Sequence, residues 1–174
     1  MKTIATALLL LFALTACSSD EPAPSEPVQV ETHTPHPAPT PATDMTNSED
    51  VAETYARMVN THDTRIDTGP ADAMRRVQDL TTPELQAGLG TLALSGGSQW
   101  LDLARHDGYT EVTDLNRIEM NPPHATDTTQ WYDYEVQVQW NGRDSWPGDT
   151  TSRIMNIEVT KQTDGTWLVS DIAG

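Results

Sequence analysis

The chain has 174 residues and a formal net charge of −16, because 26 Asp and Glu residues outnumber 10 Lys and Arg residues. Such an acidic surface repels DNA, RNA and anionic lipid headgroups, so we expect no nucleic-acid partner. The single cysteine excludes an internal disulfide and a cysteine-based zinc site, and the length fits one folded domain behind an N-terminal extension.

The first 17 residues carry the most specific motif in the chain. Lys2 precedes an apolar run from Ile4 to Ala16, which is too short to span a membrane and has the size of a signal-peptide core. The run ends in Leu14-Thr15-Ala16-Cys17, which resembles the lipobox of bacterial lipoproteins. The resemblance implies removal of residues 1–16, a lipid on Cys17, and a protein anchored to the extracytoplasmic face of the cell membrane. The alternative is an ordinary secretory signal in which the cysteine is incidental.

Residues 17–47 have the composition of a tether. Seven prolines and five acidic residues lie between Ser18 and Thr46, and no aromatic residue does. Proline removes hydrogen-bond donors and the charges oppose collapse, so we expect a disordered spacer with polyproline character. His33 and His36 lie among the prolines without a third ligand, and we expect no metal or cofactor there.

The next part of the chain has helical periodicity. Apolar residues from Val51 to Val59 predict a helix over about 49–62, capped by Thr46 or Ser48. Gly69-Pro70 introduces a second helix over about 70–79, and Thr82-Pro83-Glu84 introduces a third that contains Leu85, Leu89 and Leu92. Trp100, Leu101 and Ala104 form a short fourth helical turn that ends at Gly108.

The pattern then changes to the period of strands. From Trp131 to Asn141 apolar and polar residues alternate strictly, which predicts a strand with one face on the core. An earlier strand over about 109–120 has Val112, Ile118 and Met120 on one face. Leu115 is out of phase with this face, which predicts a bulge at that residue. Further strands are expected over about 151–162 and 167–172.

The last two predicted strands flank Asp164-Gly165, which is a hairpin signal. A two-residue loop would put Glu158 opposite Asp171, whereas the three-residue loop Thr163-Asp164-Gly165 puts Val159 opposite Val169. We prefer the second register, because apolar cross-strand pairs stabilise a sheet and like charges destabilise it. Helices followed by antiparallel strands predict an α+β domain over residues 48–174, with three to four helices packed on a curved four-stranded antiparallel sheet.

The order of elements and the C-terminal run from Asp164 to Ile172 resemble the NTF2-like superfamily of cone-shaped α+β domains. The runs Thr61-His62-Asp63-Thr64-Arg65 and Leu80-Thr81-Thr82-Pro83-Glu84-Leu85 also resemble small extracytoplasmic actinobacterial proteins. Some of these are distantly similar to the periplasmic domain of conjugation-channel subunits, which implies a scaffolding role. The superfamily includes enzymes as well as binding modules, so the fold alone does not assign the function.

A search for catalytic groups finds only weak candidates. His62-Asp63 and His106-Asp107 are adjacent pairs that the fold would have to bring together, and His124 stands alone. The resemblance implies that an enzyme of this kind would use an acid or histidine inside the cone, for which Asp114, Asp133 and Glu135 are the acidic candidates. The alternation puts Asp133 and Glu135 on the polar face.

Three groups of side chains are candidates for binding. Four aromatic residues could line an apolar cavity, although large inward aromatics more often belong to the core: Tyr132, Tyr134, Trp140 and Trp167. Arg75 and Arg76 either pair with Asp72 and Asp79 on a helix surface or contact a partner. Trp146, in the loop 141–149, is either an exposed anchor for a partner or folded onto the sheet.

These observations predict a lipid-anchored envelope protein that binds or scaffolds, with an unidentified envelope protein as partner and no catalysis. The alternative is an NTF2-like enzyme or a carrier of a small apolar ligand that uses the cone cavity. A roomy pocket with a buried carboxylate or histidine would favour this alternative, and a cavity filled by Trp and Tyr would oppose it. A solute-binding lipoprotein of a transporter would need a larger, two-lobed body.

Overall fold

The computed structural model describes residues 42–91, 97–120 and 125–173, all of which belong to the unit formed by residues 34–174. The predicted signal box Leu14, Thr15 and Ala16, the lipidation residue Cys17 and most of the predicted tether lie outside these residues, as do Leu92 and His124. In the described ranges, no helix has both the length and the apolar character needed to cross a membrane.

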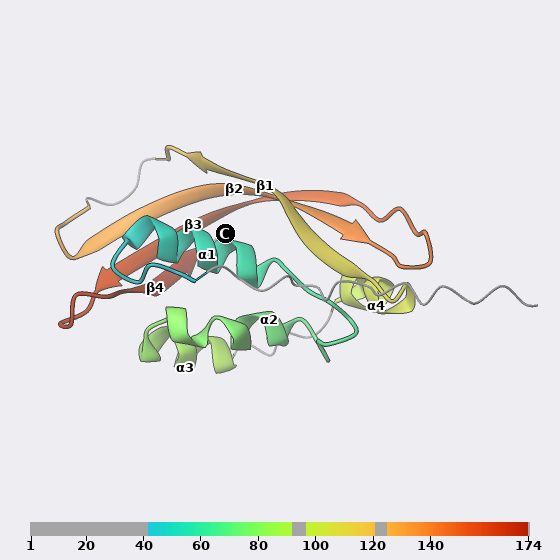
Figure 1. The fold of residues 1–174 in the computed structure, drawn as a ribbon, viewed down its shortest axis with the longest axis horizontal. Coiled ribbons are helices and arrows are strands. Elements are labelled where there is room, and N and C mark those ends of the chain that lie inside the picture. Colours follow the sequence, from blue (N-terminus) through green and yellow to red (C-terminus); the bar gives the residue numbers. More distant parts are fainter. Residues whose placement is uncertain (1–41, 92–96, 121–124, 174) are drawn as a thin grey trace, which may run out of the picture. The chain divides into compact units, whose positions relative to one another are not determined.

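The fold is α+β, as the sequence predicts. The strands β1 (Tyr109–Ile118), β2 (Thr129–Asn141), β3 (Thr150–Lys161) and β4 (Trp167–Ala173) form one antiparallel sheet in the order of the chain. The helix α1 (Ser48–Val59) lies against one face of this sheet, and α2 (Ala71–Arg76) lies on the other side of α1 (Figure 1). A 3₁₀ turn (Gln78–Leu80), α3 (Pro83–Thr91) and α4 (Ser98–Arg105) complete the helical part of the described chain.

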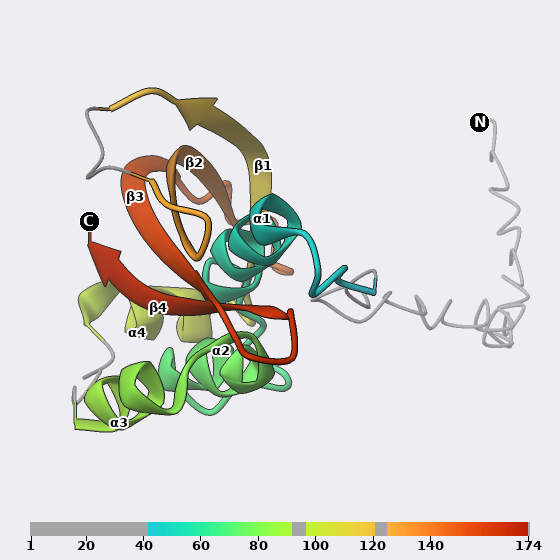
Figure 2. The ribbon, with the colours of Figure 1, turned by 90° about the vertical axis from the view of Figure 1, so that its left-hand side faces the viewer.

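The core lies between α1 and the inner face of the sheet (Figure 2). Val51, Tyr55 and Ala56 of α1 are fully buried there. The even-numbered residues of β2 and the odd-numbered residues of β3 point toward the same core, which confirms the predicted alternation: Tyr132, Tyr134, Val136, Val138, Met155, Ile157 and Val159.

One helix detail differs from the sequence-based expectation. The cap of α1 is Asn47, not Thr46 or Ser48, because the Asn47 side chain accepts hydrogen bonds from the backbone N–H groups of Glu49 and Asp50. In α4 the buried residue is Leu103, whereas Leu101 is 55% exposed. Leu103 packs directly against Gly108, where any larger side chain would clash with it.

The bulge in β1 lies earlier than predicted. The register with β2 shifts between Val112 and Asp114, so Thr113 is the extra residue. Because of this shift, Val112 and Leu115 both pack against the core, while Ile118 pairs with Asp133 and belongs to the opposite face. The prediction that Val112, Ile118 and Met120 share one face is therefore wrong.

The β3–β4 hairpin has the predicted three-residue loop. Val159 is opposite Val169, Lys161 is opposite Trp167, and Gly165 has a φ of +92°. A bulge beyond Val169 then brings Glu158 opposite Asp171, where the Ser170 hydroxyl donates a hydrogen bond to the Glu158 carboxylate at 2.6 Å. Glu158 and Asp171, the like charges that argued against the two-residue loop, are therefore still opposite each other in the observed register.

Two segments from the N-terminal part of the domain form backbone hydrogen bonds with the edge of β4. Thr81 forms a parallel bridge with Val169, and the Thr82 N–H donates to the Val169 carbonyl at 2.9 Å. The Trp167 N–H donates to the Met45 carbonyl at 2.7 Å, so the folded part already includes residues just before α1.

Candidate ligand-binding cavity

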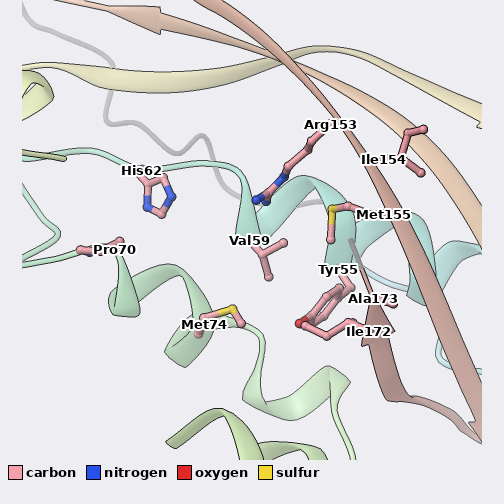
Figure 3. A pocket seen from close by; sticks show the side chains of 10 residues that line it. All are labelled: Tyr55, Val59, His62, Pro70, Met74, Arg153, Ile154, Met155, Ile172 and Ala173. Atoms are coloured by element: carbon pink, nitrogen blue, oxygen red, sulfur yellow. The ribbon is translucent and has the colours of Figure 1, made fainter. Parts of the chain in front are cut away.

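A cavity of about 270 Å³ opens between α1, α2 and β3. Its walls are largely apolar. The apolar side chains include Val59 from α1, Met74 from α2, Met155 from β3 and Ile172 from β4. Figure 3 shows the Arg153 side chain extending from β3 toward Val59 and His62. Tyr55, His62 and Arg153 are its polar side chains, and no acidic residue lines it among the described residues.

Arg153 is the most unusual of these groups. Among the described residues, no side chain or carbonyl forms a hydrogen bond or ion pair with its guanidinium. Surrounding protein lowers the pKa of Arg153 by desolvation, although the residue remains exposed to solvent. These two properties occur together when a group lines a concave site that is open to water.

His62 lies on the segment that follows α1 and is partly buried. Desolvation lowers the pKa of His62 to about 4; Asp67 opposes this shift, and the charges of Arg76 and Arg153 reinforce it. The imidazole is therefore neutral at neutral pH. Its buried Nδ1 atom has no hydrogen-bond partner in the described part of the protein, and Trp100 contacts the ring edge-on at 6.0 Å between centroids.

Tyr55 brings a third unsatisfied polar group to the cavity. Its buried hydroxyl has no hydrogen-bond partner among the described residues, and desolvation raises the pKa of Tyr55 to about 12. Buried polar atoms without a partner are rare in folded proteins, so the phenol and the imidazole both have unused hydrogen-bonding capacity among the residues that line the cavity.

A second cavity of about 530 Å³ lies next to the first and shares Val59, His62, Pro70 and Arg153 with it. Trp140 lines this second cavity and donates its indole N–H to the Thr151 hydroxyl at 3.1 Å. Since His62 and Arg153 border both spaces, they are the polar centre of the whole hollow region.

The low pKa of His62 predicts a specific pH dependence of stability. Between about pH 6.5 and pH 4 the unfolded chain holds a proton on His62 that the folded chain does not, so the free energy of unfolding decreases as the pH falls through this window. One such proton gives a slope of at most about 1.4 kcal/mol per pH unit. We expect the His62→Phe variant to lose this part of the slope in urea titrations at about pH 7, 6 and 5. Equal slopes for the two proteins would contradict the buried, neutral imidazole.

The adjacent His–Asp pairs of the sequence do not form dyads. Asp63 binds Arg143, with 2.7 Å between Oδ2 and Nη2, and does not bind His62. The Nδ1 atom of His106 lies 2.7 Å from Asp144, a residue of the β2–β3 loop. Neighbouring side chains point in different directions, and each histidine therefore meets the group that the fold places opposite it.

Trp146 packs against the C-terminal end of α4. Its ring stacks on His106 with 4.4 Å between centroids, and the residue is half-buried. The loop folds back because Arg143 N–H donates to the His106 carbonyl and the His106–Asp144 contact closes the same turn. The ring therefore folds back onto His106 and not onto the sheet, and a role of Trp146 in partner binding stays a prediction.

The two candidate arginines of α2 have different environments. Arg75 pairs with Asp72 on the helix surface, as expected. Arg76 does not pair with Asp79; it binds the buried Asp67 and the Thr61 carbonyl. The partner could not be inferred from helical spacing, because Asp67 lies on the segment that precedes α2.

The aromatic candidates belong mainly to the core. Tyr132, Tyr134 and Trp167 are at most 7% exposed and do not line either cavity, whereas Trp140 does. The Tyr132 hydroxyl is 2.7 Å from the Ser48 hydroxyl and thereby ties α1 to the sheet.

The acidic candidates lie away from the cavity. Asp133 is only 6% exposed on the outer face of the sheet, where the Asn156 side chain and the Met120 N–H donate to it. Glu135 accepts from Ser152 on the same face, and Asp114 accepts from Asn116 at the exposed edge. Within the described ranges, no three His, Cys, Asp or Glu residues are grouped so that they could hold a metal ion.

Sequence reasoning overlooked Arg153. It has the same parity as Met155, Ile157 and Val159, so a cation stands at a core-facing position of β3. That break in the alternation was a usable signal.

The chain was also compared with known proteins. No protein-family model matches it, and the search of curated proteins finds no match either.

Proposed function

We propose that this protein is a lipid-anchored, non-enzymatic binding protein of the cell envelope that holds a small ligand between α1, α2 and β3. The observation that carries the proposal is an open cavity with apolar walls in which Arg153, His62 and Tyr55 have unused polar groups. Ligand sites usually combine such walls with a few convergent polar groups. The meander of strands behind N-terminal helices supports an NTF2-like cone as the scaffold.

The properties of His62 support binding more than catalysis. A general base works best when its pKa lies near the working pH, and the pKa of His62 is about 4. Among the described residues no carboxylate forms a hydrogen bond with the imidazole that would orient it, and the charge of Asp67 does not outweigh the desolvation. An envelope protein that contacts the domain stays a prediction, and Arg75 is its remaining exposed candidate.

Native mass spectrometry of the protein recovered from its own cells tests the proposed function. We expect a bound small molecule in the unaltered protein, and its loss when Met74→Trp fills the cavity from α2. Met120→Trp is the matched control, because Met120 is 46% exposed and lies outside the cavity. Ala173→Trp narrows the cavity from an exposed position and serves if Met74→Trp does not fold. A ligand that stays bound in both cavity variants, or no ligand in the unaltered protein, would contradict the proposal.

A further inference from the structure

The position of Arg153 indicates the charge of the ligand. In the register of the sheet Arg153 lies opposite Val136, which is fully buried, and it precedes the core residue Met155 on the same face of β3. The surrounding protein partly desolvates the guanidinium, but Arg153 still reaches solvent, so an anion that enters the cavity can contact it.

Other arginines that pack against the domain have such partners. Arg143 binds Asp63, and Arg76 binds Asp67. Arg153 has no carboxylate within ion-pair distance in the described part of the chain, although 26 acidic residues occur in the sequence. Acidic residues are thus abundant in the chain, yet none of the described ones lines this cavity.

The geometry points to a small amphipathic carboxylate as the ligand, with its carboxylate on the Arg153 guanidinium and its apolar tail against Val59, Met74 and Met155. This inference rests on the proposed function of the cavity. A guanidinium presents two parallel N–H groups that match the two oxygens of a carboxylate.

The volume of the first cavity sets the size of the probe ligand, although the adjoining cavity of about 530 Å³ also borders Arg153. A volume of 270 Å³ corresponds to about nine water molecules at about 30 Å³ each, which suits about ten non-hydrogen atoms. Octanoate has this size and combines one negative charge with an unbranched apolar tail. Octanol and octylammonium have tails of the same length with no charge and with a positive charge.

Methyl NMR of methionine tests the inference, because Met74 and Met155 line the cavity and Met120 does not. The full chain carrying Cys17→Ala allows titration without lipid or detergent. We expect octanoate to shift the Met74 and Met155 signals and to leave Met120 unchanged. Octanol should bind at least about tenfold more weakly, because a hydrogen bond to a charged group contributes about 1.5 to 3 kcal/mol. Octylammonium should not bind.

Replacement of Arg153 provides the decisive comparison. Arg153→Met should weaken octanoate binding at least about tenfold and leave octanol binding unchanged. Arg153→Lys should retain part of the preference, and Arg57→Met, which removes an exposed arginine of α1, should retain all of it. Equal affinities for octanol and octanoate, or an unchanged octanoate affinity in Arg153→Met, would overturn the carboxylate assignment and leave the cavity as a binding site. If octanoate shifts no methionine signal, the carboxylate assignment is also wrong. The proposed binding function is tested separately, by the native mass spectra described above.

Discussion

Replacing Arg143 with methionine is expected to lower the free energy of unfolding by about 3 to 5 kcal/mol, because it leaves the buried Asp63 carboxylate without its partner. The side chains of Arg143 and Asp63 are only 8% and 2% exposed. Their two nitrogen–oxygen contacts measure 3.0 and 2.7 Å, and Arg143 also donates to the Asp107 carbonyl at 2.7 Å. Urea titration of the purified protein measures the change.

A matched control removes an exposed arginine. Arg105 pairs with Asp102 at side-chain exposures of 70% and 50%, so Arg105→Met should change the free energy of unfolding by about 0 to 1 kcal/mol. The double variant Asp63→Leu/Arg143→Met should recover part of the loss, because it leaves no buried charge unpaired. If Arg143→Met and Arg105→Met have the same small effect, the Asp63–Arg143 pair is not buried in solution.

Replacing Cys17 with alanine is expected to abolish lipid attachment. Cys17 is the only cysteine and follows Leu14-Thr15-Ala16, so no other thiol can carry the lipid. Each acyl CH₂ buried in a membrane contributes about 0.8 kcal/mol, and two or more chains are needed for stable anchoring. Metabolic labelling of the native cells with an alkyne fatty acid measures the effect as loss of the labelled band.

The intact mass provides a second measurement of the same change. The unaltered protein should lack residues 1–16 and carry the added lipid, and Ser18→Ala should behave in the same way. Cys17→Ala should carry no lipid. A label on the Cys17→Ala variant, or an unlabelled mature protein with a free Cys17 thiol, would show that the chain has an ordinary secretory signal.

The strands were the most predictable part of the fold. Apolar and polar residues alternate with a period of two from Trp131 to Asn141. Over a segment of this length, only one register places Tyr134, Val136 and Val138 on the core face. The β3–β4 loop was predictable for a similar reason, because Gly165 marks the position with positive φ.

The details that failed depend on contacts between distant segments. The bulge at Thr113 is set by pairing with β2, and Leu115 alone indicated only that the period was broken. The burial of Leu103 in α4, which the sequence did not single out, depends on its contact with the chain at Gly108. In both places the local sequence allowed several arrangements that only tertiary packing distinguished.

The candidate cavity was accessible only in part. His62 was a candidate, yet its adjacent carboxylate suggested a pairing with Asp63 that the fold does not form. Arg153 was missed because arginine on a strand end is usually read as a solvent-exposed residue. Its parity with Met155 was the available signal, and the lack of a carboxylate opposite it could be recognised only in three dimensions.

The two edge strands of the sheet affect whether crowded copies of this protein aggregate. A free strand edge can pair with the edge of another molecule and start aggregation, and bulges, charges or covering segments prevent this. On β4 the backbone contacts of Met45 and Thr82 cover the edge, whereas β1 has its bulge at Thr113 beside Asp114 and Arg117. If lipid anchors concentrate the chain on a membrane surface, neighbouring domains would meet often, and these two different protections would keep their sheets from joining.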